Sequence, residues 1–299
     1  MGRVVVLGAG ISGHTAASFL RKWLGRSHEI VVISPRPTYN WIPSNIWVGV
    51  GCMTREQVEF DIKPIYDRTG VAFHQAKAVA LHPEGAADEA NPFVVVEYTD
   101  EARKGQTARI TYDFLINATG PKLTFGATKG LGPEGNSYSV CTPDHAVHLW
   151  KAVQEAIERM KRGERQRFLV GTGHGLCTCQ GAAFEYVTNL DFILRKHGVR
   201  DKADMTWISN EYSLGDFGMD GLYLRRGGYV THSRVVTESL FAERGLTWIT
   251  QSHVTEVSKD RVAFETLSGE EHEEGFDVAM LLPPFAGVGL KAFDKAGGD

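Results

Sequence analysis

The chain has 299 residues, of which 42% are hydrophobic and 23% charged, a composition typical of a soluble globular protein with room for two domains. Its formal net charge of −4 argues against nucleic-acid binding, because neutralising phosphates takes a concentrated excess of Lys and Arg. Four cysteines are too few to hold a secreted domain together by disulfides.

The N-terminal segment reads as a strand, a glycine turn and a helix. The apolar run RVVVL is followed by Gly8, Gly10 and Gly13 in the pattern G-x-G-x-x-G, then by a helical stretch that ends on Gly25 and a second strand, EIVVIS. In such a turn the first glycine makes the bend, the second lets the backbone approach a pyrophosphate, and the third lets helix and strand pack closely. The segment therefore predicts dinucleotide binding.

The acid that usually binds the ribose at the end of the second strand is missing from this unit. Ser34, Pro35 and Arg36 stand there instead. We expect a hydroxyl or a backbone group to hold the ribose, with Arg36 beside the adenosine.

The next segments read as strands joined by polar turns. Between residues 71 and 112 they predict an inserted antiparallel β layer. The stretch YDFLINATG, from Tyr112 to Gly120, predicts a buried strand that returns to the first sheet and ends in small residues.

The second half repeats the strand, turn and helix order. A helix capped by Thr142 or Asp144 leads into the strand RFLV and the glycine turn GTGHG. DMTWIS reads as the next strand, YVTHSRVVTESLFAERG as a helix, and LTWIT, SHVTEVS and RVAFET as short strands. We expect a first domain at residues 1–122, a second at 123–274, and a return of 275–299 to the first.

The second glycine turn, residues 171–176, departs from the nucleotide-binding pattern. Leu176 replaces the third glycine, and Cys177 and Cys179 follow, so a pyridine nucleotide is expected to fit poorly. Amides at a helix start favour the reactive thiolate. Two residues apart on a helix, these side chains point about 200° apart, so only one can face a flavin, which we take to be Cys179. The alternatives are that Cys177 is a small buried hydrophobe, or that His174, Cys177 and Cys179 begin a metal site. No matching second ligand cluster follows, so we predict no metal.

Several motifs together resemble those of sulfide:quinone oxidoreductases, flavoproteins of the two-dinucleotide-binding-domain superfamily. The motifs extend over essentially the whole chain and are YNWIPSNIWVGVG, ATGPKL, SVCTPDHA, CQGAAFEY and MLLPPFAGV. The resemblance implies an α/β fold of two Rossmann-like dinucleotide-binding domains with an inserted antiparallel β layer. It also implies FAD along the first domain and redox cysteines where a pyridine nucleotide would otherwise bind.

The resemblance implies a reaction and roles for four residues. Hydrosulfide attacks a disulfide or sulfur-bridged cysteine pair, a released thiolate attacks the flavin, and two electrons pass to a membrane quinone. Cys179 matches the cysteine that carries the sulfur, and Cys141 the one that some members link to the flavin. His145 matches a histidine near flavin and quinone, and Glu185 an acid near the sulfur site. As plainer alternatives, His145 is a polar residue early in a helix and Glu185 favours its helix N-terminus.

The resemblance also carries over flavin-contacting residues from the first glycine turn, the end of the second strand and two of the motifs, together with one lysine that contacts adenine through its backbone. They are Gly8, Gly10, Ser12, Gly13, Ser34, Arg36, Pro43, Ser44, Asn45, Lys77, Thr119, Gly120 and Pro121.

Two departures from the family pattern stand out. Asp216 occupies a position where some members carry histidine. Family members also continue beyond the point that matches Asp299, through a second flavin-binding segment, a third cysteine and amphipathic membrane helices. We therefore expect a C-terminally incomplete chain.

Other properties are less determined by the sequence. No signal peptide or transmembrane helix is predicted, which favours a cytoplasmic location or peripheral attachment to the cytoplasmic membrane. Membrane-surface association and homo-oligomerisation stay open, and Cys52 is expected to be a bystander. The alternatives to sulfide oxidation are an NADH-dependent flavoprotein dehydrogenase or disulfide reductase, and an inactive FAD-binding fragment.

Overall fold

The computed structural model describes residues 2–298, which form two compact units. The first unit comprises the chain up to Trp41, Glu59–Lys122, and the residues from Gly287 onward. The second comprises Ile42–Val58 and Leu123–Ala286. Both units are therefore discontinuous in sequence.

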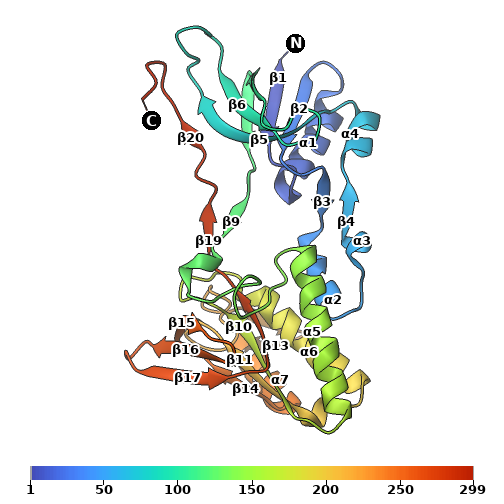
Figure 1. The fold of residues 1–299 in the computed structure, drawn as a ribbon, viewed down its shortest axis with the longest axis vertical. Coiled ribbons are helices and arrows are strands. Elements are labelled where there is room, and N and C mark those ends of the chain that lie inside the picture. The colour runs from blue at the N-terminus through green and yellow to red at the C-terminus, as the bar shows by residue number, and fades with distance from the viewer. Residues whose placement is uncertain (1, 299) are drawn as a thin grey trace. The chain divides into compact units, whose positions relative to one another are not determined.

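The first unit is built on one sheet with the strand order β7-β6-β5-β2-β1-β8. Figure 1 labels β1, β2, β5 and β6 of this sheet. The strands β1, β2, β8 and the start of β5 run parallel, and their apolar residues pack into a core around Val5, Leu7 and Val31. The strands are β1 (Arg3–Leu7), β2 (Glu29–Ser34), β5 (Ala72–His82), β6 (Phe93–Tyr98), β7 (Thr107–Thr111) and β8 (Phe114–Asn117).

Helix α1 (Ile11–Leu24) joins β1 to β2 and ends at Gly25, as predicted. Its buried residues are the small Gly13 and Ala17, which allow close packing on the sheet. The remaining elements of this unit are α4 (Lys63–Thr69), the antiparallel pair β3 (Thr38–Asn40) and β4 (Glu59–Asp61), and β20 (Lys291–Ala292), which pairs with β5.

The inserted antiparallel layer extends this same sheet. The first part of β5 pairs in parallel with β2, ending at the Ser34–Gln75 pair, and the rest pairs antiparallel with β6, which pairs with β7. The predicted layer is confirmed. The strand predicted over YDFLINATG is confirmed as β8, which returns to the first sheet beside β1. The expected burial was wrong, because none of its four residues is buried and Phe114 is 63% exposed.

The second unit contains a parallel sheet with the order β14-β11-β10-β18. Its strands and the helices that connect them are α5 (Pro143–Lys161), β10 (Gln166–Thr172), α6 (Gln180–Lys196), β11 (Ala203–Ile208), α7 (Ser233–Arg244), β14 (Leu246–Ile249) and β18 (Val278–Leu282).

Two antiparallel sheets complete this unit. The three-stranded sheet β15-β16-β17 and the hairpin β12–β13 lie outside the parallel sheet. Their strands are β12 (Tyr223–Arg226), β13 (Tyr229–His232), β15 (Ser252–Val257), β16 (Arg261–Thr266) and β17 (Glu271–Gly275). The strands β9 (Pro121–Leu123) and β19 (Phe285–Gly287) pair with each other.

The predicted strand LTWIT is confirmed as β14, which pairs with β11 at the edge of the parallel sheet. Two other sequence-based assignments in this unit were wrong. Residues 229–232 form β13 rather than the start of a helix. FDVAMLL does not return to the first unit, because β18 pairs with β10 and all five of its residues are buried there.

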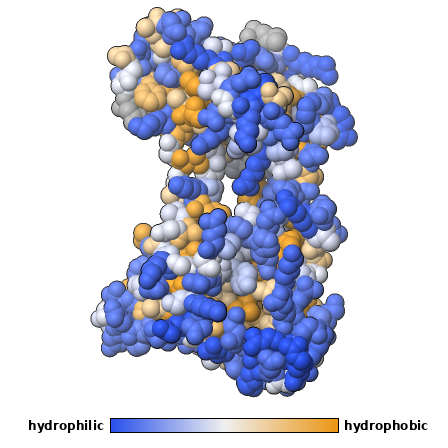
Figure 2. Space-filling view, viewed as in Figure 1, coloured by the Kyte–Doolittle hydropathy of each residue, from blue (hydrophilic) through white to orange (hydrophobic). Residues whose placement is uncertain are grey.

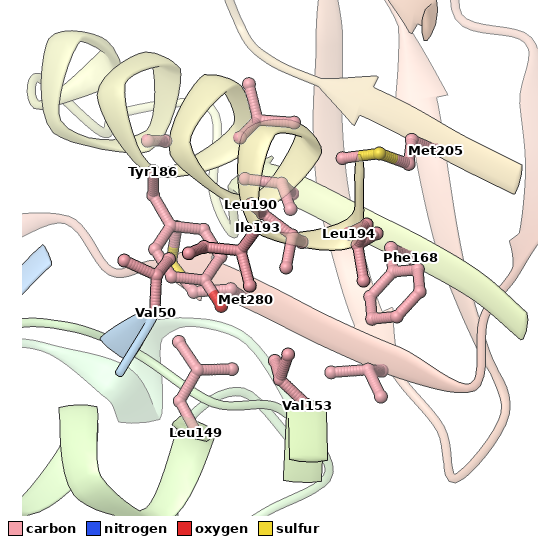
Figure 3. Packing of buried hydrophobic residues seen from close by; sticks show 14 of the residues in the cluster. Val50, Leu149, Val153, Phe168, Tyr186, Leu190, Ile193, Leu194, Met205 and Met280 are labelled. Carbon is pink, nitrogen blue, oxygen red and sulfur yellow. The ribbon is translucent and has the colours of Figure 1, made fainter. Parts of the chain in front are cut away.

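The segment Ile42–Val58 also lies in the second unit, although the first domain was expected to include it. Its helices are α2 (Asn45–Gly49) and α3 (Arg55–Val58). Val50 of this segment packs in one hydrophobic cluster with Leu149 of α5 and Tyr186 of α6 (Figure 3). The Tyr186 hydroxyl also donates to the Gly49 carbonyl at 3.3 Å. Burial of these apolar residues explains why the segment joins this core.

Hydrophilic residues dominate the surface visible in Figure 2. Over residues 2–298, no helix has both the length and the apolar character needed to cross a bilayer.

Candidate functional site

The predicted flavin residues of the first unit gather at one edge of its sheet. The turn with Gly8 to Gly13 follows β1, Ser34 ends β2, and Thr119 follows β8 by two residues. These three strands are parallel neighbours, so their carboxyl ends meet at the same edge, where open α/β sheets bind ligands. Lys77 lies just beyond the Ser34–Gln75 pair.

The glycines of this turn fit a dinucleotide. Gly8 has a φ of 94°, and a Cβ added there would lie 2.2 Å from the Ala118 carbonyl oxygen. A Cβ on Gly13 would lie 2.0 Å from the Gly8 oxygen, so both positions require glycine for packing. A Cβ on Gly10, in contrast, would meet no atom within 4 Å, which leaves room for a pyrophosphate at the start of α1.

Three other predicted flavin contacts belong to the second unit. Pro43 is exposed, Ser44 precedes α2, and Asn45 is fully buried at the start of that helix. Of the remaining contacts, Arg36 and Pro121 are exposed in the first unit.

The second glycine turn has the same place in its unit but a different environment. Its backbone amides already donate to protein acceptors. Gly175 N donates to His253 Nδ1 at 2.8 Å and Leu176 N to His174 Nδ1 at 3.0 Å. Gly173 N donates to the Leu282 carbonyl and Cys177 N to the His174 carbonyl. These amides are the groups that would otherwise bind a pyrophosphate.

The space next to Gly173 of this turn is also filled, by the side chain of Leu131. A Cβ on Gly173, which corresponds to Gly10 of the first turn, would lie 2.3 Å from Leu131 Cδ1. Glu211 follows β11, where a nucleotide-binding unit carries its ribose-binding acid. Its carboxylate is buried and accepts from Ser209 Oγ at 2.7 Å and Phe217 N at 2.9 Å. This geometry disfavours a pyridine nucleotide at the second turn.

Three thiols gather beside this turn. Cys177 is part of the main hydrophobic cluster of the second unit, and Cys141 and Cys179 pack against it. All three are free thiols, and Cys179 is close enough to both others to act on them electrostatically. Cys177 is 2% exposed, its Sγ contacting the Pro283 carbonyl, whereas the other two are partly accessible.

The thiolate character expected of Cys177 and Cys179 is not found. Burial raises the pKa of Cys141 to about 12 and that of Cys177 to about 11, and it also raises the pKa of Cys179. Helix α6 begins only at Gln180, so both turn cysteines precede it and the argument from helical angles does not apply. Backbone hydrogen bonds lower the pKa of both turn thiols, but desolvation outweighs them.

The two predicted proton-transfer residues lie on the helices next to these thiols. Thr142 caps α5 by accepting from His145 N, and His145 Nδ1 is 2.8 Å from Ser139 Oγ. Ser139 Oγ also accepts from Cys141 N at 3.3 Å, which connects the histidine to that cysteine. Glu185 is exposed on α6. Its negative charge adds to burial in raising the pKa of Cys179.

Asp216 has a structural role in its loop. It accepts from the amides of Tyr212 and Gly218, both at 2.8 Å. Cys52 is exposed. Within residues 2–298, no three His, Cys, Asp or Glu side chains are arranged to hold a metal ion.

Sequence reasoning missed the residues that close the second turn, namely Leu131, Asn210, Glu211 and His253. Asn210 Nδ2 donates to the carbonyls of Gly175 and Cys177, at 2.8 and 2.9 Å. Only Glu211 carried a signal, since it is an acid that directly follows a strand next to β10.

The chain is similar to known proteins over nearly its whole length. It is 33% identical over 294 residues to the sulfide-quinone reductase of Aquifex aeolicus, covering 98% of this chain and 61% of that protein. It is 25% identical to the mitochondrial sulfide:quinone oxidoreductase of Dictyostelium discoideum, covering 94% of this chain and 56% of that protein. The chain thus spans about three fifths of the length of these relatives. No model of a protein family matches it.

The chain is also similar in fold to solved structures. The crystal structure of the Aquifex aeolicus sulfide:quinone oxidoreductase superposes with a TM-score of 0.80 at 32% identity, covering 96% of this chain and 59% of that one. NDH2 from Plasmodium falciparum in complex with NADH superposes with a TM-score of 0.72 at 15% identity, covering 97% and 56%, and shows the shared fold alone. The resemblance to sulfide:quinone oxidoreductases is confirmed over nearly the whole chain, as is the predicted α/β fold class.

Proposed function

We propose that the chain is the flavin- and cysteine-bearing part of an oxidoreductase that oxidises sulfide and passes the electrons to a quinone. The observation that carries this proposal is the second glycine turn. Its amides are bound to protein acceptors, Leu131 fills the space above Gly173, and three thiols lie beside it. The second unit therefore offers sulfur where related folds offer a nucleotide site.

The first unit would hold FAD. Gly8 and Gly13 fix the tight turn, Gly10 leaves its backbone open to the pyrophosphate, and Ser34 stands at the ribose end of β2. When bound, FAD supplies a two-electron acceptor that can pass its electrons on to a quinone.

Cys179 would carry the sulfur, because it is the more accessible thiol of the turn. In its oxidised form it shares an S–S bond with a partner sulfur. Hydrosulfide attacks Cys179 Sγ, a new S–S bond forms there, and the partner leaves as a thiolate with the electron pair. Cys141 would have the role of the cysteine that some family members link to the flavin.

The partly buried thiols of Cys141 and Cys179 need a proton acceptor, because desolvation raises their pKa and keeps them protonated at neutral pH. Glu185, whose charge acts on Cys179, would be the acceptor for the proton of that thiol. His145 Nδ1 contacts Ser139 Oγ, and Ser139 also hydrogen-bonds the side chain of Cys141, so His145 would move protons at this second thiol.

Anaerobic reduction of bound flavin tests this proposal. The purified chain, loaded with FAD, is mixed separately with sulfide and with NADH while the flavin absorbance is followed. We expect sulfide to bleach the flavin and NADH to leave it oxidised. Bleaching by NADH alone would favour an NADH dehydrogenase or disulfide reductase. If neither donor acts, even with a soluble quinone present, an inactive FAD-binding fragment is favoured.

Two serine variants assign the sulfur carrier. Cys179→Ser should abolish reduction by sulfide, whereas the matched control Cys52→Ser, which alters an exposed cysteine, should reduce at the wild-type rate. Unchanged kinetics in Cys179→Ser would refute its role.

A further inference from the structure

The turn that carries the redox cysteines is held by two histidine rings. His253 on β15 accepts from Gly175 N at 2.8 Å, and His174 within the turn accepts from Leu176 N at 3.0 Å, both through Nδ1. The ring centroids are 4.6 Å apart, with the planes at 84°. The two rings thus contact each other and hold successive amides of the same turn.

Both hydrogen bonds require a neutral histidine. A backbone amide can only donate, so each Nδ1 must be free of its proton and the ring proton must sit on Nε2. A protonated imidazole carries N–H on both nitrogens, which replaces the hydrogen bond by two opposed donors. Two adjacent imidazolium rings would also repel each other.

The approach of His253 is built into the backbone. A Cβ on Gly175 would lie 2.8 Å from His253 Nδ1, so only glycine lets the ring come this close. Ser252, next to His253, donates from both its amide and its hydroxyl to the Ser209 carbonyl, at 3.1 and 2.8 Å. These bonds fix the strand position from which the ring extends.

The opposite side of the turn is held by groups that do not titrate. Asn210 Nδ2 donates to the carbonyls of Gly175 and Cys177, and Gln180 Nε2 donates to the Cys177 carbonyl at 3.0 Å. The histidines are therefore the titrating part of this support.

We propose that His174 and His253 are positioning residues that keep the cysteine-bearing turn closed only while both rings are neutral. Protonation of either ring frees an amide, loosens residues 173–177 and exposes Cys177. The proposal concerns the thiols themselves and requires neither bound flavin nor sulfide.

The surroundings of His174 favour its neutral form. Burial lowers the pKa of His174, and the neighbouring His253 lowers it further. On β16, Glu265 lies opposite His253, and Arg261 of the same strand pairs with Glu273. Glu256, on the same strand as His253, is paired with Lys129. In the closed turn each histidine Nδ1 accepts a hydrogen bond from an amide, and this disfavours protonation of the ring. The closed turn is therefore favoured at neutral pH, and it is lost as the pH falls.

The test compares wild type with His253→Asn. Asparagine places Oδ1 where His253 has Nδ1, so it can accept from Gly175 N, but it does not titrate. Cys177 is labelled with 4,4′-dithiodipyridine between pH 7.5 and 5 and quantified by peptide mass spectrometry. At each pH the labelling rate of Cys177 in wild type is divided by its rate in the variant. This ratio cancels the ordinary pH dependence of the thiol and of the groups that both proteins share.

We expect a ratio near one at pH 7.5 that rises roughly fivefold by pH 5, the factor that corresponds to the net loss of one hydrogen bond. His253→Ala, which lacks any acceptor, should label faster than His253→Asn at every pH. His174→Asn supplies an independent comparison, because its Oδ1 can accept from the amide two residues on. A ratio that stays at one for both asparagine variants would overturn the proposal.

Discussion

Asp191 on α6 has no exposed surface, and its Oδ1 accepts from Arg200 Nε at 2.6 Å. Its other oxygen, Oδ2, accepts from Arg195 and Arg244. Burial alone would raise the pKa of Asp191, but these hydrogen bonds outweigh it and lower the pKa. The carboxylate of Asp191 therefore connects α6 to Arg200, which lies just before β11, and to Arg244, which lies just before β14.

Asp191→Asn should destabilise the protein strongly. It removes the negative charge and leaves the guanidinium groups without their counterion, at a cost of about 3 kcal/mol. Urea unfolding with a fluorescence readout measures the change in free energy. Because the pKa of Asp191 is lowered in the folded state, its contribution is present at neutral pH and lost as the pH falls below about 4.

Asp204→Asn is the matched control, because Asp204 pairs with Arg165 on the surface. Exposed pairs contribute about 1 kcal/mol or less. Equal losses in the two variants would contradict the structural role assigned to Asp191.

Gly10 and Gly13 should respond differently to alanine. Gly13→Ala places a Cβ 2.0 Å from a backbone oxygen and should disrupt the first unit, whereas Gly10→Ala meets no protein atom within 4 Å and should cost at most about 1 kcal/mol as a helix cap. Gly10→Ala should nevertheless weaken FAD binding by roughly tenfold or more, about 1.4 kcal/mol, because its methyl group occupies the pyrophosphate approach. Thermal unfolding without FAD and fluorescence titration with FAD separate the two effects.

If Gly10→Ala bound FAD as tightly as wild type, the flavin would not lie across this turn. That result would leave the structural role of Gly13 unaffected.

The buried thiols should make the protein sensitive to alkali. Burial raises the pKa of Cys141 to about 12, whereas an unfolded cysteine titrates at about 8.5. The unfolded state therefore loses its proton first, and stability falls as the pH rises above that value. At pH 10 this thiol accounts for up to about 2 kcal/mol of the loss.

Cys141→Ser should accordingly show a smaller drop in melting temperature between pH 7.5 and 10 than wild type does. Cys52→Ser, at an exposed position, serves as the comparison and should behave like wild type. An identical drop in all three proteins would argue against burial as the cause.

Local signals in the sequence predicted the parts of the fold that depend on neighbouring residues. The glycine turn at Gly8, the helix that ends at Gly25 and the cap at Thr142 all rest on contacts within a few residues. The motifs spread along the chain then identified the fold class.

Contacts between distant residues could not be predicted in this way. A fully apolar strand such as β18 can be buried in either sheet, so its sequence does not determine which sheet it joins. His253 lies 78 residues from Gly175, and no motif near either residue predicts the hydrogen bond between them. The pKa of Cys179 depends on burial, which overrides the local effect of the helix start.

The interleaving of the two units limits how the chain can be divided. The residues Ile42–Val58 interrupt the first unit in sequence and belong to the second. There they complete the core around Leu149 and Tyr186. A recombinant fragment spanning 123–286 would lack that apolar cover and expose the cluster to water. Dissecting the protein into separately expressed halves therefore calls for circular permutation or co-expression rather than a single cut.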